Sequence, residues 1–489
     1  MSPTTARNQQ PPAGTSPEEG RDPRRWKALT VCLAAGFMTL LDVSIVNVAL
    51  PSIQAGLNAS QSALQWVVAG YALTFGLVLV PAGRLGDARG RRGAFMVGLA
   101  LFTLASVAAG AAQGAAWLSV ARLAQGAAGG LLNPQVIGII QQLFRGAERG
   151  RAFGLLGAVI GISTAVGPLL GGAIIRLAGS EAGWRWVFYV NLPVGILALV
   201  LAWRLIPPVA RSGSRSHDLD PVGVLLLGAG VVTLLLPFVE ARHWPGALKW
   251  SLVPAAMVLL ALFVAWEYLY AARGREPVVR LELFRARSYS LGISLATAYF
   301  AGFTGIFFIL TLYLQEGLGY SALLAGLAMT PFAVGSAVGS TVGGAAISRF
   351  GRLVIVVGLL LVTVGLAATA AAAYLHPGYA VAAWAALPLL VAGFGSGLVI
   401  SPNQALTLTA VPVRHGGSAG GVLQTGQRIG TAVGIAASSA VFFSTLAGAA
   451  ASHGQWAVAF RHGLRVIIGF VVLALLLALA DVIVGRRRG

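Results

Sequence analysis

The sequence predicts an all-α integral membrane protein with fourteen transmembrane helices, built as two six-helix bundles with two further helices inserted between them. Hydrophobic residues make up 57% of the 489 residues and charged residues only 10%, whereas a soluble protein carries about a quarter charged residues. Fourteen apolar runs are long enough to cross a bilayer. The first six and the last six runs also share motifs at matching places, which indicates an internal repeat.

The predicted spans follow one another with short polar connections, and each has near or above the roughly 20 residues that a helix needs to cross the hydrocarbon core. The first six are expected at residues 27–50, 62–83, 93–112, 116–141, 151–170 and 186–205. The inserted pair is expected at residues 221–240 and 250–271. The last six are expected at residues 289–314, 323–347, 353–374, 383–408, 417–443 and 464–484.

The chain is therefore expected to divide into five parts. These are a disordered cytoplasmic tail over residues 1–26, a six-helix bundle over 27–205, the inserted helices and their linkers over 206–287, a second six-helix bundle over 288–485 and a basic cytoplasmic tail over 486–489. The first tail is rich in Pro, Gly and charged residues and has no apolar core, so it is not expected to be a signal peptide.

The net charge of +19 would suit a nucleic-acid-binding protein, but the placement of the charges favours a membrane. Basic residues gather in both tails and in the connections after even-numbered spans, as at residues 84–92, 145–151 and 273–287. The positive-inside rule then places both termini in the cytoplasm. We expect the lipid bilayer and not nucleic acid as the partner, and the excess of Arg over Lys indicates the cytoplasmic (inner) membrane of a bacterium with a GC-rich genome.

Two motifs carry the internal repeat. The stretch Gly83–Arg92 after span two has a counterpart at Gly344–Arg352 after span ten, with Ser348 in the place of Asp87. Span four contains Asn-Pro-Gln and span twelve contains Pro-Asn-Gln at a similar depth. Two related bundles around a cavity at the membrane midplane are the architecture of an alternating-access carrier.

Span one contains a lone carboxylate, Asp42. A charged side chain at the bilayer centre costs roughly 2.5–3.5 kcal/mol on the mildest scale, so Asp42 should face a cavity, take a partner or bind a proton. The partner predicted for it is Arg122 in span four, because a rise of 1.5 Å per residue puts both side chains about 10–12 Å below the outer edge. Two interpretations stay open at this point: a structural salt bridge, or a pair that also tunes a proton site.

Polar side chains inside other spans are the candidates for contact with a substrate. Arg428 in span thirteen, about 16 Å into the membrane, needs a partner or a wet cavity, and it could either attract an anionic group or pair with a backbone carbonyl. The full set of substrate-cavity candidates is Asn47, Gln125, Gln135, Gln404, Gln424 and Arg428.

Two glycine-containing motifs are candidates for conformational gating. Asp87 can cap a helix end, and the arginines beside it can bridge the two halves on the cytoplasmic side. In span five, glycines four residues apart permit close helix contact and a proline bends the helix. The gating candidates are Gly83, Asp87, Gly90, Arg91, Gly167, Pro168 and Gly171.

These motifs together resemble the major facilitator superfamily, and within it the fourteen-helix drug:proton antiporters. The resemblance rests on Leu41–Pro51, Gly83–Arg92, Arg122–Gly126, Gly167–Gly172 and Trp184–Pro193. The glycine-proline run of span five is typical of exporters. Ala88 stands where the family usually has Arg, which weakens one expected contact. Spans ten and thirteen lack the extra carboxylates of members that export bivalent cations.

The resemblance implies proton-driven export of small hydrophobic or amphipathic compounds such as drugs or antibiotics, with protons as the coupling ion, no cofactor and a monomeric carrier. Two alternatives stay open: an exporter dedicated to one native metabolite or antibiotic, and a membrane sensor or scaffold with a transporter fold. Nothing in the sequence suggests an enzyme, because it has neither a G-x-x-x-x-G-K-[ST] phosphate loop nor an H-E-x-x-H zinc motif. The single cysteine, Cys32, excludes an intramolecular disulfide and a Cys-based metal cluster.

Overall fold

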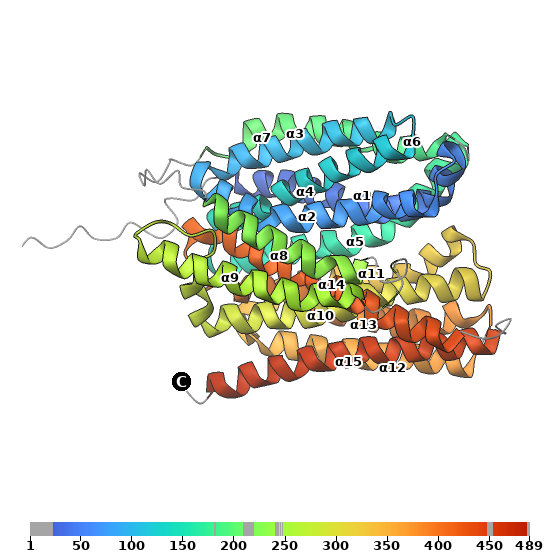
Figure 1. Ribbon diagram of the computed structural model, residues 1–489. Coiled ribbons are helices and arrows are strands. Elements are labelled where there is room, and N and C mark those ends of the chain that lie inside the picture. The colour runs from blue at the N-terminus through green and yellow to red at the C-terminus, as the bar shows by residue number, and fades with distance from the viewer. Residues whose placement is uncertain are drawn as a thin grey trace, which may run out of the picture.

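The computed structural model describes residues 23–179, 182–208, 220–239, 244, 246, 248–376, 378–446 and 453–486. The two predicted tails lie almost wholly outside the described residues, as does the linker after the first bundle. Helices that run side by side make up the described part of the chain (Figure 1). The predicted all-helical membrane fold is confirmed.

The first half of the chain forms six spans from seven helices. They are α1 (Arg25–Leu57), α2 (Gln61–Arg89), α3 (Arg91–Gly110), α4 (Ala115–Leu143), α5 (Gly146–Ala178), α6 (Gly183–Tyr189) and α7 (Asn191–Leu205). The inserted pair is α8 (Pro221–Val239) and α9 (Leu252–Ala272). The second half consists of α10 (Arg287–Leu312), α11 (Ala322–Phe350), α12 (Leu353–Leu375), α13 (Val381–Thr407), α14 (Gly416–Leu446) and α15 (His453–Arg486).

Thirteen helical segments are long and apolar enough to cross a membrane, and they match thirteen of the fourteen predicted spans. The remaining predicted span is α4, a helix of 29 residues whose buried Arg and Gln side chains lower its hydropathy. Its length of about 43 Å, at 1.5 Å per residue, exceeds the hydrocarbon thickness. The last helix, α15, begins eleven residues before the predicted span because its first turns carry polar side chains beyond the apolar run.

The sixth span is broken between α6 and α7 at Val190. Pro193 has no N–H to donate to the carbonyl of Tyr189, so the regular hydrogen-bond ladder cannot run through this point. The break brings Asn191, the first residue of α7, to a buried position in the centre of the first half.

The two halves meet along two seams, α2 against α14 and α5 against α11. Gly83 on α2 lies directly against the backbone of Gly417, so a side chain at residue 83 would clash. On the other seam, Gly154 of α5 lies equally close to Gly344 of α11. Small residues allow such backbone contact between membrane helices, where van der Waals packing and not water exclusion drives association.

The inserted pair covers the first of these seams. Leu73 of α2, Val231 of α8 and Phe263 of α9 share one apolar cluster, against which Ile429 of α14 packs. Figure 1 shows α8 and α9, in green, lying between the blue first half and the yellow-to-red second half. The insertion therefore binds to both halves at once.

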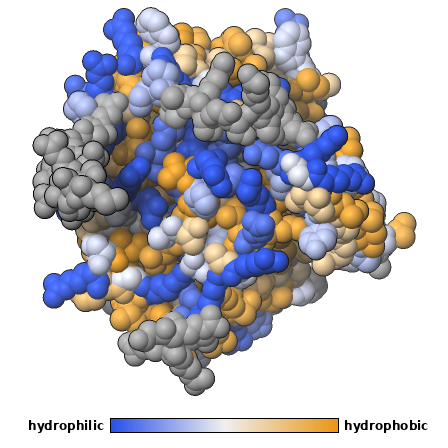
Figure 2. Space-filling view, turned by 90° about the vertical axis from the view of Figure 1, so that its left-hand side faces the viewer, coloured by the Kyte–Doolittle hydropathy of each residue, from blue (hydrophilic) through white to orange (hydrophobic). Residues whose placement is uncertain are grey.

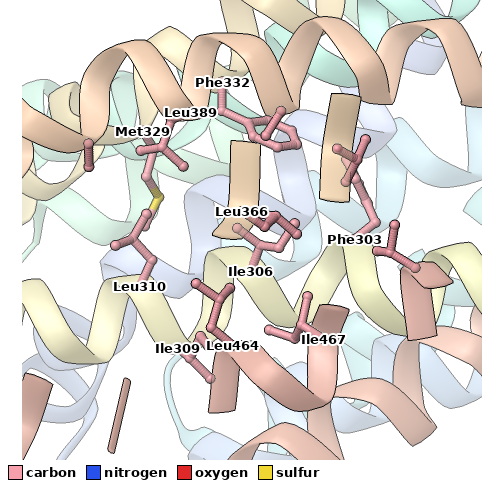
Figure 3. Packing of buried hydrophobic residues seen from close by; sticks show 14 of the residues in the cluster. Phe303, Ile306, Ile309, Leu310, Met329, Phe332, Leu366, Leu389, Leu464 and Ile467 are labelled. Carbon is pink, nitrogen blue, oxygen red and sulfur yellow. The ribbon is translucent and has the colours of Figure 1, made fainter. Parts of the chain in front are cut away.

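The second half has an extended apolar core. Phe303, Ile306 and Ile309 of α10 face Phe332 of α11 and Leu464 of α15, and all five are almost completely buried. Figure 3 shows these side chains pointing toward one another from separate helices.

One end of the molecule, which we call the arginine-rich end, carries residues 84–92, 145–151 and 349–352. The first turns of α1 and α5 meet there through an ion pair between Arg25 and Glu148, with a nitrogen–oxygen distance of 3.0 Å. Figure 2 looks onto this end and shows hydrophilic side chains spread across it.

Candidate functional site

The carboxylate of Asp42 lies at the centre of the first half and is fully buried. Its Oδ2 accepts a hydrogen bond from Nη1 of Arg122 at 2.5 Å, which makes the two side chains an ion pair. Its Oδ1 accepts hydrogen bonds from Nε2 of Gln125 at 2.8 Å and from Nδ2 of Asn191 at 3.0 Å. Three side chains from α4 and α7 thus surround one carboxylate on α1.

A second layer of contacts holds these donors in place. Ser106 of α3 accepts from Nε2 of Gln125 at 3.2 Å and from Nδ2 of Asn191 at 2.9 Å. The same hydroxyl donates to the carbonyl of Phe188 at 2.9 Å. Because each amide bonds both the carboxylate and the hydroxyl, neither can turn away without losing two hydrogen bonds.

The guanidinium of Arg122 is equally constrained, and the side chain is 2% exposed. Its Nε donates to the carbonyl of Val67 on α2 at 3.1 Å, and Nη1 also donates to Oε1 of Gln125 at 2.8 Å. The ring of Tyr71 covers it, with 4.2 Å between Cζ and the ring centroid. Removing one partner from a buried pair of this kind leaves an uncompensated charge, which is strongly destabilising.

Two of the predicted cavity residues lie elsewhere than expected. Gln125 belongs to the Asp42 network and is completely buried, so it does not face a substrate cavity in this conformation. Gln135 is also completely buried, and its Nε2 donates to the carbonyl of Ala82 at 2.8 Å, which ties α4 to α2. For both residues the prediction is corrected: they hold helices together.

The other cavity candidates are spread over three helices. Asn47 is exposed on α1, just over one turn beyond Asp42. Gln404 on α13 and Gln424 on α14 each have a buried Oε1 with no hydrogen-bond partner among the described residues. Their assignment to a substrate cavity stays a prediction.

Arg428 lies on α14, half-buried, with its guanidinium over the ring of Phe75 on α2 at 4.3 Å from Cζ to the ring centroid. Phe75 stacks on Tyr71, with ring centroids 5.9 Å apart. Since Tyr71 also covers Arg122, two aromatic rings separate the arginine of the second half from the Asp42 pair.

At the arginine-rich end, Asp87 of α2 bridges the two halves. Its Oδ1 accepts from the backbone N–H of Gly417 at 3.0 Å, and its Oδ2 accepts from the N–H and the hydroxyl of Ser418 at 2.8 and 3.1 Å. Asp87 therefore caps the N-terminus of α14, where a negative charge is favoured by the free N–H groups and the helix dipole.

Arg91 fastens the same bridge. It contacts Asp87 Oδ1 through Nε at 3.1 Å and Nη2 at 2.8 Å, and it donates to the carbonyl of Gly138 at 2.5 Å and to that of Val413. Gly90, which precedes it, has a φ of 106°, a conformation that side-chain-bearing residues rarely adopt.

A second ion pair links this region to the segment after the inserted helices. Nη2 of Arg84 lies 2.5 Å from Oε2 of Glu276. Burial alone would raise the pKa of Glu276, but the hydrogen bond and the positive charge of Arg84 outweigh it and hold the pKa below its usual range.

The glycine-proline motif of α5 packs next to the Asp42 site. Gly167 lies against Ser44, and Gly171 lies against Ile45, so both glycines allow α5 to approach α1 beside Asp42. Pro168 faces the other way, toward Gly326 of α11. Their role in gating stays a prediction, but their position connects the Asp42 site with the second seam.

Three residues of this site were missed from the sequence. Asn191 lies in a motif that was recognised, and its position before Pro193 is a signal that could have marked it. Tyr71 and Ser106 carry no signal, because aromatic and hydroxyl side chains are common in membrane helices.

Comparison with known proteins agrees with this architecture. The family model described as Major Facilitator Superfamily matches residues 32–435. A protein named "Probable actinorhodin transporter" from Streptomyces coelicolor is 37% identical over 451 residues, with 89% of this chain and 77% of that protein covered. Puromycin resistance protein pur8 from Streptomyces alboniger is 36% identical over 480 residues, with 96% and 93% covered. The tetracenomycin C resistance and export protein of Streptomyces glaucescens is 32% identical, with 87% and 78% covered.

Solved structures share the fold at low sequence identity. The human organic anion transporter MFSD10 superposes with a TM-score of 0.66 at 15% identity, over 94% of this chain and all of that one. The proton:xylose symporter XylE superposes with a TM-score of 0.64 at 16% identity, over 93% and 94%. Since the family model covers most of the chain and relatives above 30% identity span it nearly from end to end, the protein belongs to the major facilitator superfamily.

Proposed function

We propose that this protein is a proton-coupled antiporter that exports hydrophobic drugs or antibiotics across the bacterial cytoplasmic membrane by alternating access. The observation that carries the proposal is the buried ion pair between Asp42 and Arg122 in a superfamily carrier whose relatives are named as resistance and export proteins. A carboxylate is the group of this pair that can gain and lose a proton, because Arg stays charged.

The geometry supports a coupling step in the first half. Donors from Arg122, Gln125 and Asn191 favour the ionised carboxylate, whereas burial favours the neutral acid. Protonation of Asp42 would remove the ion pair and leave Arg122 to seek another acceptor. Because α1 packs directly on the glycine motif of α5, a shift at Asp42 can reach the seam between α5 and α11.

We further propose that the arginine-rich end is cytoplasmic, with both termini on that side, as the positive-inside rule predicts. Asp87 and Arg91 then close the cytoplasmic end, and α14 must leave Asp87 before the cavity opens to the cytoplasm. Loss of these hydrogen bonds and their recovery would be one half of the transport cycle. We propose a monomer as the working unit.

Two other functions are weighed against this one. An exporter dedicated to one native antibiotic is favoured by the names of the actinorhodin and tetracenomycin relatives. A sensor with a transporter fold would not need a buried carboxylate inside an all-donor site.

The test begins with drug-susceptibility profiling of an efflux-deficient bacterium that expresses either the wild type or Asp42→Asn. A drug that the wild type resists is then measured in proteoliposomes under an imposed pH gradient. Broad resistance supports multidrug export, and resistance to one compound supports a dedicated exporter. Absence of gradient-driven flux for every compound would contradict the proposal and favour a sensor.

A further inference from the structure

Arg428 is a cation inside the membrane with little in the protein to neutralise it. It lies twelve residues after the first residue of α14, which places it about 18 Å along the helix from the arginine-rich end. Among the described residues, no hydrogen-bond or ion-pair partner reaches its guanidinium, and no backbone carbonyl does so either. Of the two interpretations left open by the sequence, pairing with a carbonyl is therefore not what this conformation shows.

The surroundings of Arg428 combine an aromatic face with an unused acceptor. The ring of Phe75 lies 4.3 Å from Cζ of Arg428. Gln424, four residues earlier and so on the same face of α14, has a buried Oε1 that no described residue satisfies. A buried polar atom without a partner costs free energy, so both side chains are prepared to take up hydrogen bonds from outside the protein.

The charge balance near this site is positive. Asp42 and Arg122 neutralise each other, and the stacked rings of Tyr71 and Phe75 separate that pair from Arg428. The three charges sum to one positive charge, and that charge belongs to the half-buried residue. A cationic ligand beside Arg428 would meet repulsion, whereas an anionic oxygen group would gain charge-assisted hydrogen bonds.

We propose that Arg428 is the substrate-recognition residue for a planar aromatic compound that carries an ionised carboxylate or phenolate group. The guanidinium binds the anionic oxygen, the ring of Phe75 stacks on the aromatic plane, and Oε1 of Gln424 accepts from a hydroxyl or amine of the compound. This inference rests on the proposed export function and adds the chemical class of the preferred substrate.

The experiment compares two dyes with the same xanthene skeleton and opposite charge: fluorescein, an anion at pH 7.4, and rhodamine 123, a cation. Binding of each dye to the purified full chain in nanodiscs is measured by fluorescence polarisation for the wild type, Arg428→Gln and Arg428→Lys. Arg461→Gln serves as the matched control, because Arg461 lies over Tyr374, away from α2 and Phe75.

We expect Arg428→Gln to weaken fluorescein binding by about tenfold or more, the effect of losing hydrogen bonds from a charged group. Rhodamine 123 binding should change less than about twofold or become tighter, since a repulsive charge is lost. Arg428→Lys should keep part of the fluorescein affinity, because the charge remains without the planar fork of donors. Arg461→Gln should leave both dyes unchanged.

Equal weakening of both dyes by Arg428→Gln, or no change for either, would overturn the inference. Thermal unfolding of each variant separates recognition from folding: a variant that unfolds at the wild-type temperature and loses only fluorescein supports recognition. If Arg428→Gln does not fold, the Lys variant and Phe75→Leu carry the test. Phe75→Leu should weaken both dyes, and selective loss of rhodamine 123 there would also contradict the proposal.

The proposed function can fail separately from this inference. Wild-type protein that binds fluorescein through Arg428 but moves no compound under a pH gradient would contradict export and retain the binding site. Wild-type protein that exports drugs while Arg428→Gln binds both dyes like the wild type would contradict the binding site and retain export.

Discussion

The two six-helix halves share an architecture but differ in what their centres contain. The first half encloses the Asp42–Arg122 ion pair, and donors from four helices surround it. The second half encloses aliphatic and aromatic side chains, with isolated hydroxyls such as that of Ser438, which donates to the carbonyl of Gly434 in its own helix. A fold repeated in sequence can therefore keep its helices while only one copy retains buried charge.

The repeated glycine-rich motif shows the same asymmetry at the arginine-rich end. Asp87 in the first copy reaches across to cap α14 of the second half. Ser348, which replaces it in the second copy, bonds the carbonyl of Ala345 in its own helix. The nearby Arg352 instead pairs with Asp481 of its own half.

This difference teaches that contact across the halves depends on the carboxylate and not on the glycine frame. Both copies allow close backbone approach, but only the first supplies a charge that the helix N-terminus of the other half can bind. The four predictions that follow test the asymmetry, from the largest expected effect to the smallest.

Asp42→Asn should abolish gradient-driven transport, because an amide cannot gain and lose the coupling proton. It should also lower stability by up to about 3–5 kcal/mol, since Arg122 becomes a buried charge without a counter-ion. Transport in proteoliposomes and thermal unfolding in detergent measure the two effects. In the second half, Ser438→Ala should change neither by much. Wild-type transport rates in Asp42→Asn would remove the proton site from the first half.

The double variant Asp42→Asn with Arg122→Gln separates stability from coupling. Removing both charges eliminates the uncompensated one, so stability should recover relative to Asp42→Asn alone. Transport should stay absent. Recovery of transport together with stability would show that the pair has only a structural role.

Gly167→Leu should strongly reduce export, because the glycine lies against Ser44 of α1 and a leucine would force α5 away from the Asp42 site. Gly172→Leu is the matched control, since a side chain there meets open space. Efflux from cells and the expression level of each variant provide the measurement. Undiminished efflux with leucine at residue 167 would reduce the motif to local packing.

Asp87→Asn should partly reduce transport and make the arginine-rich end more accessible, because a neutral cap holds α14 less strongly by about 1 kcal/mol. Labelling of a cysteine introduced at Gly420, which lies against Ile137 between the halves, reports the opening. Ser348→Ala in the second copy should alter neither transport nor labelling. Equal effects of the two substitutions would contradict the asymmetry between the motifs.

Glu276→Gln should have the smallest effect, because the pair with Arg84 is partly exposed. The lowered pKa of Glu276 means that its contribution to stability is complete above the ordinary glutamate pKa of about 4.3 and disappears as the pH falls through the lowered value. Wild type and variant should therefore differ slightly in thermal midpoint at pH 7 and converge below pH 4. A difference that grows as the pH falls would contradict this assignment.

Much of the site could be predicted from helical geometry. Matched depth on α1 and α4 led to the expected partnership of Asp42 and Arg122, and the two side chains do meet. The same reasoning could have placed Gln125, since residues three apart share a helix face and Gln125 must point where Arg122 points. Its assignment to the substrate cavity was wrong because the face had been considered for one residue and not for its neighbour.

By itself the sequence determined the number and order of the spans, the arginine-rich end and the rarity of Asp42. These follow from local rules: the bilayer sets a minimum length of apolar run, and a lone charge within it is costly wherever it points. Only the tertiary structure decided which donors surround Asp42, that Asp87 caps α14 and that Arg428 faces Phe75. Those contacts join residues far apart in the chain, and they depend on how each helix is rotated about its axis. Apolar residues all around a membrane helix leave that rotation unspecified until the helices pack.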